Sequence, residues 1–179
     1  MPLMINGCLI DLSHLIPIFR RVNLELRGNF KKEVDVLFEF SCHCYSRRIL
    51  PEEVVPLDLL VVDGSSKMPR NRLFDQKRYS LSKHLVSLID LIIEGNAKVT
   101  KTRHENFYRT ELFQKQTSDF DICIRYFMFM SASVVIQPGR TKYLRVYIES
   151  AYPEQLGIPH PKGKGVLNFA AMLGEKWAQ

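Results

Sequence analysis

The 179-residue sequence lacks the features of a membrane protein or of a secreted disulfide scaffold. Its longest apolar stretches are only a handful of residues, well short of the roughly 20 that a membrane-spanning helix needs. The N-terminal segment MPLMINGCLIDLSHLIPIF has neither a basic region nor a small-residue cleavage site, so we expect no secretory signal. Four cysteines are too few for a disulfide framework in a chain of this size. We therefore expect a cytoplasmic protein with free thiols and no membrane partner.

Familiar catalytic motifs are missing as well. The sequence has no glycine-rich phosphate loop, no GxGxxG, no GxSxG elbow and no HExxH, which argues against an NTPase, a Rossmann dehydrogenase or an α/β-hydrolase. No internal repeat and no Gly/Ser-rich linker divides the chain. We expect a single domain over residues 1–179, with its core at about residues 34–153 and with the N-terminal segment and a C-terminal helix packed on that core.

What the sequence does contain is a local excess of positive charge. The net charge of +6 is concentrated between Lys67 and Arg109, where ten basic residues face four acidic ones, while the rest of the chain is balanced. Such segregation is typical of proteins that bind a polyanion, because side chains that neutralise phosphates release counterions. A basic surface that only keeps the protein soluble is the alternative. We expect RNA or another nucleic acid as the partner.

The hydrophobic pattern predicts an α+β fold. Residues 33–45 (EVDVLFEFSCHCY) alternate apolar and polar side chains, which is typical of a strand with one buried face. Residues 46–78 contain three prolines and Gly64, and they predict a long loop with one short strand at residues 59–62. Later elements are expected as strands at residues 98–103, 107–113, 120–130 and 144–152 and a final helix at residues 166–177. This order favours a mostly antiparallel twisted sheet with a few helices packed on one side.

The clearest helix is expected between Ser80, a suitable N-cap, and Gly95. Apolar side chains recur there at helical spacing, at Leu81, Leu85, Leu88, Ile89 and Ile92. His84 lies beside this apolar stripe, and Lys83 lies on the open face. In the strand at residues 144–152, the same kind of alternation places Ser150 and Tyr152 on the face of Leu144.

The tightest group of potential metal ligands is Cys42-His43-Cys44. Two thiols at i and i+2 on one strand face can chelate zinc if His84 or His104 completes the site, and Cys44 can act as a nucleophile if a base comes from elsewhere. On a strand, however, His43 points away from both cysteines, and core-facing cysteines usually behave as small hydrophobes. We expect no metal and no cofactor, with a structural zinc module as an alternative.

Side chains suited to cleaving RNA without a metal lie on this helix and on the basic strand after it. Attack of the RNA 2′-hydroxyl on its own phosphate needs a base, an acid and cations beside the phosphate. Histidine, tyrosine and arginine are suitable for these roles. The alternative is that the histidines and tyrosines are packing residues and that the basic residues are merely solvated.

Several segments resemble a known group of proteins. The order KHLVSLIDLI, NFYRTEL, DICIRYFMF and LRVYIESAYP resembles the barnase/RelE-like (BECR) ribonuclease superfamily. With FSCHCYSRR and RYSLSKHL, it also resembles uncharacterised mobile-element proteins, some labelled stationary-phase growth adaptation proteins. The resemblance spans about residues 34–153. It implies His84 as acid or base, Arg47 or Arg103 as phosphate clamp and Ser150 or Tyr152 as hydroxyl partner. The superfamily also contains inactive binding modules.

The leading hypothesis is an RNA-binding protein that acts as a metal-independent endoribonuclease of toxin type. The expected catalytic residues are His84, His104, Tyr108, Ser150 and Tyr152. The expected nucleic-acid-binding residues are Arg47, Arg78, Lys83, Lys101, Arg103 and Arg109. The competing hypothesis is a non-catalytic phage or mobile-element protein that inhibits a host defence or a nucleic-acid-processing complex. A neutralising or target protein is the other partner to look for.

Overall fold

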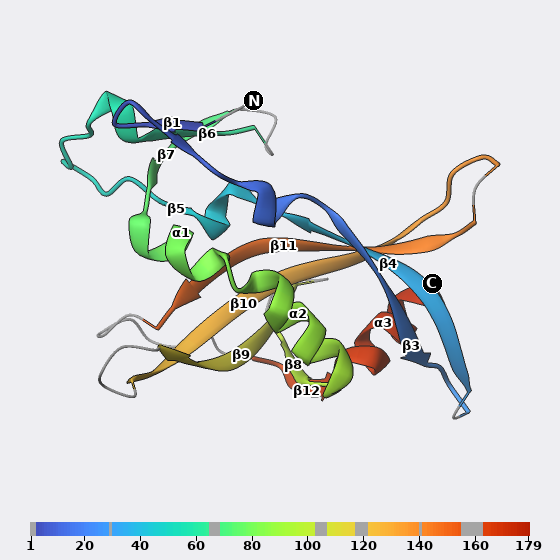
Figure 1. Ribbon diagram of the computed structural model, residues 1–179. Coiled ribbons are helices and arrows are strands. Elements are labelled where there is room, and N and C mark those ends of the chain that lie inside the picture. Colours follow the sequence, from blue (N-terminus) through green and yellow to red (C-terminus); the bar gives the residue numbers. More distant parts are fainter. Residues whose placement is uncertain are drawn as a thin grey trace.

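The chain forms an α+β structure in which helices cover one side of a mostly antiparallel sheet, so the predicted fold class is confirmed (Figure 1). The computed structural model describes residues 3–28, 30–64, 69–102, 107–116, 122–139, 141–154 and 163–179, and for residues 107–109, 111–116 and 122–124 it describes the backbone. The strands are β1 (Leu3–Ile5), β2 (Cys8–Ile10), β3 (Ile18–Glu25), β4 (Lys31–Phe40), β5 (Ser46–Arg47), β6 (Leu60–Asp63), β7 (Arg70–Phe74), β8 (Lys98–Lys101), β9 (Phe107–Gln116), β10 (Ile122–Val135), β11 (Tyr143–Pro153) and β12 (Gly165–Asn168). The helices are α1 (Gln76–Ser82), α2 (Leu85–Glu94) and α3 (Phe169–Trp177), with 3-10 turns η1 (Ser13–Leu15), η2 (Cys42–Cys44) and η3 (Leu57–Leu59).

The main sheet has seven strands in the order β12-β8-β9-β10-β11-β4-β3 within the described chain. Every neighbouring pair is antiparallel except β4 and β11, which run parallel with Leu144 opposite Val36. Two antiparallel groups of strands, one from each end of the chain, are thus joined by one parallel pair.

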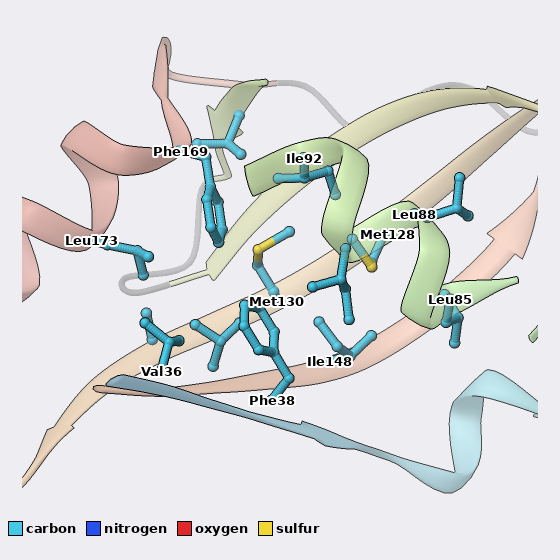
Figure 2. Packing of buried hydrophobic residues seen from close by; sticks show 14 of the residues in the cluster. Val36, Phe38, Leu85, Leu88, Ile92, Met128, Met130, Ile148, Phe169 and Leu173 are labelled. Carbon is cyan, nitrogen blue, oxygen red and sulfur yellow. The ribbon is translucent and has the colours of Figure 1, made fainter. Parts of the chain in front are cut away.

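The hydrophobic core lies between this sheet and helices α2 and α3 (Figure 2). Helix α2 contributes side chains at i, i+3, i+4 and i+7, as its sequence predicts, because these positions share one helix face. Strands β4, β10 and β11 contribute every second side chain from the facing side of the sheet. The fully buried members include Phe38, Leu85, Ile89, Met128 and Ile148.

A second, smaller sheet occupies the segment that the sequence predicts to be mostly loop. Strands β5, β7 and β6 pair in that order, and β7 is antiparallel to both neighbours. The β1–β2 hairpin lies beside this sheet, at the upper left of Figure 1. The short strand predicted at residues 59–62 corresponds to β6, whereas β5 and β7 were missed because they are only two and five residues long, too short for a period-two pattern to stand out.

Several predicted elements have different boundaries in the structure. The strand expected at residues 33–45 ends at Phe40, and a 3-10 turn follows. The helix expected from Ser80 starts earlier, at Gln76, because the Asp75 side chain caps it by accepting a bond from the Arg78 N–H at 2.9 Å. It is also interrupted between α1 and α2. Residues 165–168 form β12, so the last helix begins at Phe169.

Candidate functional site around Cys42, His43 and Asp63

The predicted helical position of His84 is not realised. His84 precedes the first residue of α2, and its side chain is exposed. Its backbone N–H donates to the Leu81 carbonyl at 3.1 Å, which closes α1 before α2 begins. Among the described residues, no side-chain hydrogen bond, ion pair or ring contact of His84 brings it to Ser150 or Tyr152. The structure therefore does not assemble His84 with the predicted hydroxyl partners.

A bulge in β11 changes the face that Ser150 and Tyr152 occupy. Phe129 of β10 pairs with Ser150 but Met130 pairs with Ile148, so one extra residue stands in β11 at Glu149. Beyond the bulge, Ala151 takes the core-facing position. Tyr152 stacks on Phe129 instead, with ring centroids 5.4 Å apart. The expectation that Ser150 and Tyr152 share the Leu144 face is wrong, because strict alternation ignores an inserted residue.

Two of the predicted phosphate-binding cations have carboxylate partners. Arg47 pairs with Glu53 and lies 4.0 Å from Asp75. Lys101 lies 2.9 Å from Glu175 of α3, at the β8 side of the sheet. Lys83 is exposed, with its ammonium 4.8 Å from the centre of the Tyr79 ring.

Four of the predicted site residues fall wholly or in their side chains outside what the structure describes. His104 and Arg103 lie outside the described residues, and so do the side chains of Tyr108 and Arg109 in β9.

A hollow of about 910 Å³ is lined by residues of β3, β4, α3 and their flanks, and it contains none of the predicted site residues.

The structure instead gathers a different set of reactive groups on η2 and β6. The side-chain ligand atoms of Cys42, His43 and Asp63 all lie within 4.8 Å of one another. The His43 Nε2 atom is 2.8 Å from Asp63 Oδ2. Asp63 is nearly buried at 8% side-chain exposure, whereas His43 is 29% exposed. The group is thus open to solvent on the histidine side.

The local backbone explains why Cys42 and His43 meet. Ser41 caps η2, because its Oγ accepts the His43 N–H at 3.1 Å. The Cys44 and Tyr45 N–H groups then close the turn on the carbonyls of Ser41 and Cys42, each at 3.1 Å. In a 3-10 turn, successive side chains no longer point to opposite sides as they do on a strand. The expectation that His43 points away from Cys42 therefore does not hold, because it assumed a strand through residue 45.

Ser46 links this turn to the small sheet through hydrogen bonds. It is fully buried, and its Oγ donates to the Cys42 carbonyl at 2.7 Å. The same Oγ accepts from Arg72 Nε at 2.8 Å. The Ser46 carbonyl accepts from Arg72 Nη2 at 3.1 Å and from Arg78 Nη1 at 3.0 Å. Two half-buried guanidinium groups therefore converge on one peptide oxygen.

Arg78 also links the turn to the end of the main sheet. Its Nη1 donates to the His43 carbonyl at 3.3 Å, and its guanidinium lies 4.9 Å from the centre of the Tyr152 ring. Arg78 and Tyr152, both predicted as site residues, are thus brought together. Neither Arg78 nor Arg72 forms an ion pair within the described part of the chain.

Burial dominates the electrostatics of this centre. It raises the pKa of the Cys42 thiol above its ordinary value, and the nearby Asp63 carboxylate raises that pKa further. Burial also raises the pKa of Cys44 to about 12, so this core thiol stays protonated. The pKa of each of the Arg72 and Arg78 guanidinium groups is lowered by burial, which disfavours their charged form.

Sequence reasoning identified Cys42, His43 and Arg78 as residues of interest but missed Ser46, Asp63 and Arg72. One signal was available: Ser41 directly before Cys42 is a good N-cap and could have marked the end of the strand. Asp63 and Arg72 carried no local signal, because only the pairing of β6 with β7 and of β5 with β7 brings them to η2.

Comparison with known proteins identifies the family of the chain. Within the described residues, no helix is long and apolar enough to cross a membrane. No significant match to a curated protein or to a solved structure was found. The family model described as the YjaZ family matches residues 2–177, and the chain therefore belongs to the YjaZ family.

Proposed function

We propose that the protein binds single-stranded RNA through a basic group made of Arg72, Lys77, Arg78 and Lys83. The observation that carries this proposal is the convergence of Arg72 and Arg78 on the Ser46 carbonyl, with no ion pair to either in the described part of the chain. Half-buried guanidinium groups without a carboxylate partner are suited to bind a phosphate, since an anion offsets the cost of desolvating them.

The surface of α1 adds exposed positive charge beside these arginines. Gln76, Lys77, Ser80 and Lys83 are all exposed, and they fall within one arc of the helix at 100° per residue. None of these four side chains is a carboxylate, so this arc of α1 presents two positive charges to solvent. The Arg78 guanidinium lies 4.9 Å from the centre of the Tyr152 ring, a cation–π contact that positions it beside this surface.

RNA cleavage is a separate proposal. Catalysis by proton transfer requires two groups within reach of one phosphate. His84 is exposed and has no described side-chain contact with Ser150 or Tyr152, and His104 lies outside the described residues. Cleavage is tested by replacing His84 and His104 with alanine together. Unchanged cleavage by that double variant would refute their catalytic role.

Binding is tested by fluorescence anisotropy with a labelled single-stranded RNA at several salt concentrations. The variant Lys77→Glu with Lys83→Glu should weaken binding at least tenfold. It should also reduce the slope of log K against log salt by about 1–2, because two phosphate contacts are lost. The matched control is Lys31→Glu with Lys164→Glu, which makes the same charge change at exposed positions on other elements.

The control should change binding by about threefold or less. Equal losses in the two variants would show that only net charge matters and would refute a site on α1. Absence of salt-dependent binding by the unmodified chain would refute the proposed function itself.

A second candidate is the non-catalytic interaction protein that acts on a host defence or nucleic-acid-processing complex. It is favoured by four apolar side chains around the small sheet, Leu50, Val54, Leu57 and Val62, which are 61–92% exposed. Apolar side chains that form a contiguous exposed patch mark protein-binding surfaces. In this case the variant Val54→Asp with Leu57→Asp should lose a stoichiometric protein partner in a pull-down. The variant Lys77→Glu with Lys83→Glu should retain that partner. RNA incubated with the unmodified chain should stay intact.

A further inference from the structure

The centre on η2 and β6 has the composition of a transition-metal site. It offers one thiol, one imidazole and one carboxylate, from Cys42, His43 and Asp63. Zinc is bound in proteins by these three donor types, most often with four ligands in a tetrahedron. The mixture of sulfur, nitrogen and oxygen suits a borderline ion such as Zn²⁺ better than Mg²⁺ or Ca²⁺, which prefer oxygen alone.

The spacing of the donor atoms is close to what such an ion requires. Tetrahedral zinc with ordinary bond lengths holds its ligand atoms about 3.3–3.8 Å apart. Here the three ligand atoms all lie within 4.8 Å of one another, and the His43–Asp63 separation is 2.8 Å. Metal binding would replace the hydrogen bond between His43 and Asp63 and widen the separation of these two atoms by about half an ångström.

The backbone that carries these ligands is held in place before any metal binds. The Oγ of Ser41 accepts the His43 N–H at 3.1 Å, and the Oγ of Ser46 donates to the Cys42 carbonyl at 2.7 Å. Arg78 donates to the His43 carbonyl at 3.3 Å. Outer groups of this kind orient ligands and lower the entropy lost when an ion binds.

The charges at this centre also favour a cation over a free nucleophile. A thiolate at Cys42 would stand beside the Asp63 carboxylate in a half-buried place, which is costly unless a positive charge offsets both. In the described part of the chain, the Arg72 side chain donates to the Oγ and the carbonyl of Ser46 and not to Cys42 or Asp63. A cation bound among these side chains would supply that positive charge.

We propose that Cys42, His43 and Asp63 bind one divalent transition-metal ion of the zinc type, with a fourth position open to solvent on the side of His43. Binding forms bonds from the ion to sulfur, nitrogen and oxygen, and releases the Cys42 proton to solvent. The positive charges of a bound Zn²⁺ and of Arg72 would together exceed the negative charges of the Cys42 and Asp63 ligands. The open position would therefore attract an anion or water. This inference goes beyond RNA binding and does not depend on it.

The test uses the full chain, freed of metal with a chelator and titrated with Co²⁺, which occupies zinc sites and reports its ligands by its spectrum. We expect one Co²⁺ per chain, with a thiolate-to-cobalt charge-transfer band and the visible bands of tetrahedral cobalt. Addition of Zn²⁺ should remove these bands. The variants Cys42→Ser and Asp63→Asn should lose the charge-transfer band or weaken binding at least tenfold.

Matched controls make the same chemical changes away from the centre. Cys8→Ser and Asp58→Asn alter an exposed thiol and an exposed carboxylate, and both should bind cobalt like the unmodified chain. Circular dichroism checks that each variant is folded. Failure of the unmodified chain to bind cobalt stoichiometrically, or retention of the sulfur band in Cys42→Ser, would overturn the proposal.

A second measurement decides the matter if the Cys42 and Asp63 variants do not fold. The unmodified chain is alkylated with iodoacetamide with and without Zn²⁺, and each cysteine is quantified by mass spectrometry. Zinc should protect Cys42 at least tenfold and leave the exposed Cys8 unchanged. Equal alkylation of Cys42 in both samples would refute a metal site at this thiol.

Discussion

The seven-stranded sheet and the three-stranded sheet bury different kinds of side chain. The large sheet and its two helices enclose an almost wholly apolar cluster that includes Phe38, Ile89 and Met128. The smaller apolar cluster at the small sheet has Ile5, Val61, Phe74 and Tyr79 as its buried members in the described part of the chain, and the polar side chains of Ser46 and Asp63 are buried as well.

We infer that the large sheet serves as the scaffold and that the small sheet positions the candidate site. Apolar burial is non-directional, and it stabilises the large sheet without fixing any reactive group. The small sheet depends on directional bonds, of which Ser46 alone takes part in four, to the backbone or side chains of Cys42, Arg72 and Arg78. Such bonds contribute less to stability but hold side chains in defined positions.

The largest expected effect comes from opening the apolar core. Phe38→Ala removes a fully buried ring that lies 6.4 Å from the ring of Phe169. We expect the free energy of unfolding to fall by about 3–5 kcal/mol, since both transfer energy and packing are lost. Urea denaturation followed by circular dichroism measures this loss. A loss below about 1 kcal/mol would show that the large sheet does not depend on this core.

A smaller effect is expected from removing the Ser46 hydroxyl, which bonds to Cys42 and Arg72. Ser46→Ala leaves the Arg72 Nε and the Cys42 carbonyl without the partners they have in this structure. We expect a loss of about 1–3 kcal/mol, with faster amide exchange in η2 and β7 than in β10. The control Ser80→Ala alters an exposed serine and should stay within about 0.5 kcal/mol of the unmodified chain. Uniformly faster exchange in both sheets would contradict the proposed division.

The smallest effect concerns an ion pair at the edge of the small sheet. The hydrogen bond from Arg47 lowers the pKa of Glu53 from 4.5 to about 2, so the carboxylate is favoured in the folded chain. Its contribution to stability is complete above pH 4.5 and is lost as the pH falls toward 2. Glu53→Gln should therefore be less stable than the unmodified chain at pH 6 and equally stable near pH 2. Denaturation at both pH values compares them, and a gap independent of pH would contradict this expectation.

The large sheet could be predicted from the sequence where the pattern reports burial directly. The alternation before Phe40 and the spacing of Leu85, Leu88, Ile89 and Ile92 mark β4 and α2, because each face of these elements has one environment. The bulge at Glu149 has no such mark, and it displaced Ser150 and Tyr152 from their predicted face.

The candidate site could be predicted only in part, for a physical reason. Cys42 and His43 are neighbours in sequence, but Asp63 reaches them through the pairing of β6 with β7, and Arg72 reaches Ser46 from β7. Their association depends on long-range hydrogen bonds between short strands, which leave no periodic pattern. The basic residues illustrate the same limit, since the sequence shows their number but not that Lys101 faces Glu175.

The parallel pairing of β4 with β11 has a consequence for how the chain is made. During synthesis, β3 and β4 leave the ribosome early and can form their hairpin at once. The other edge of β4 must wait until residues 143–153 have emerged, since β11 is its partner there. A nascent chain therefore carries an unsatisfied strand edge through most of its elongation, and premature termination anywhere in that interval would leave a product prone to aggregate.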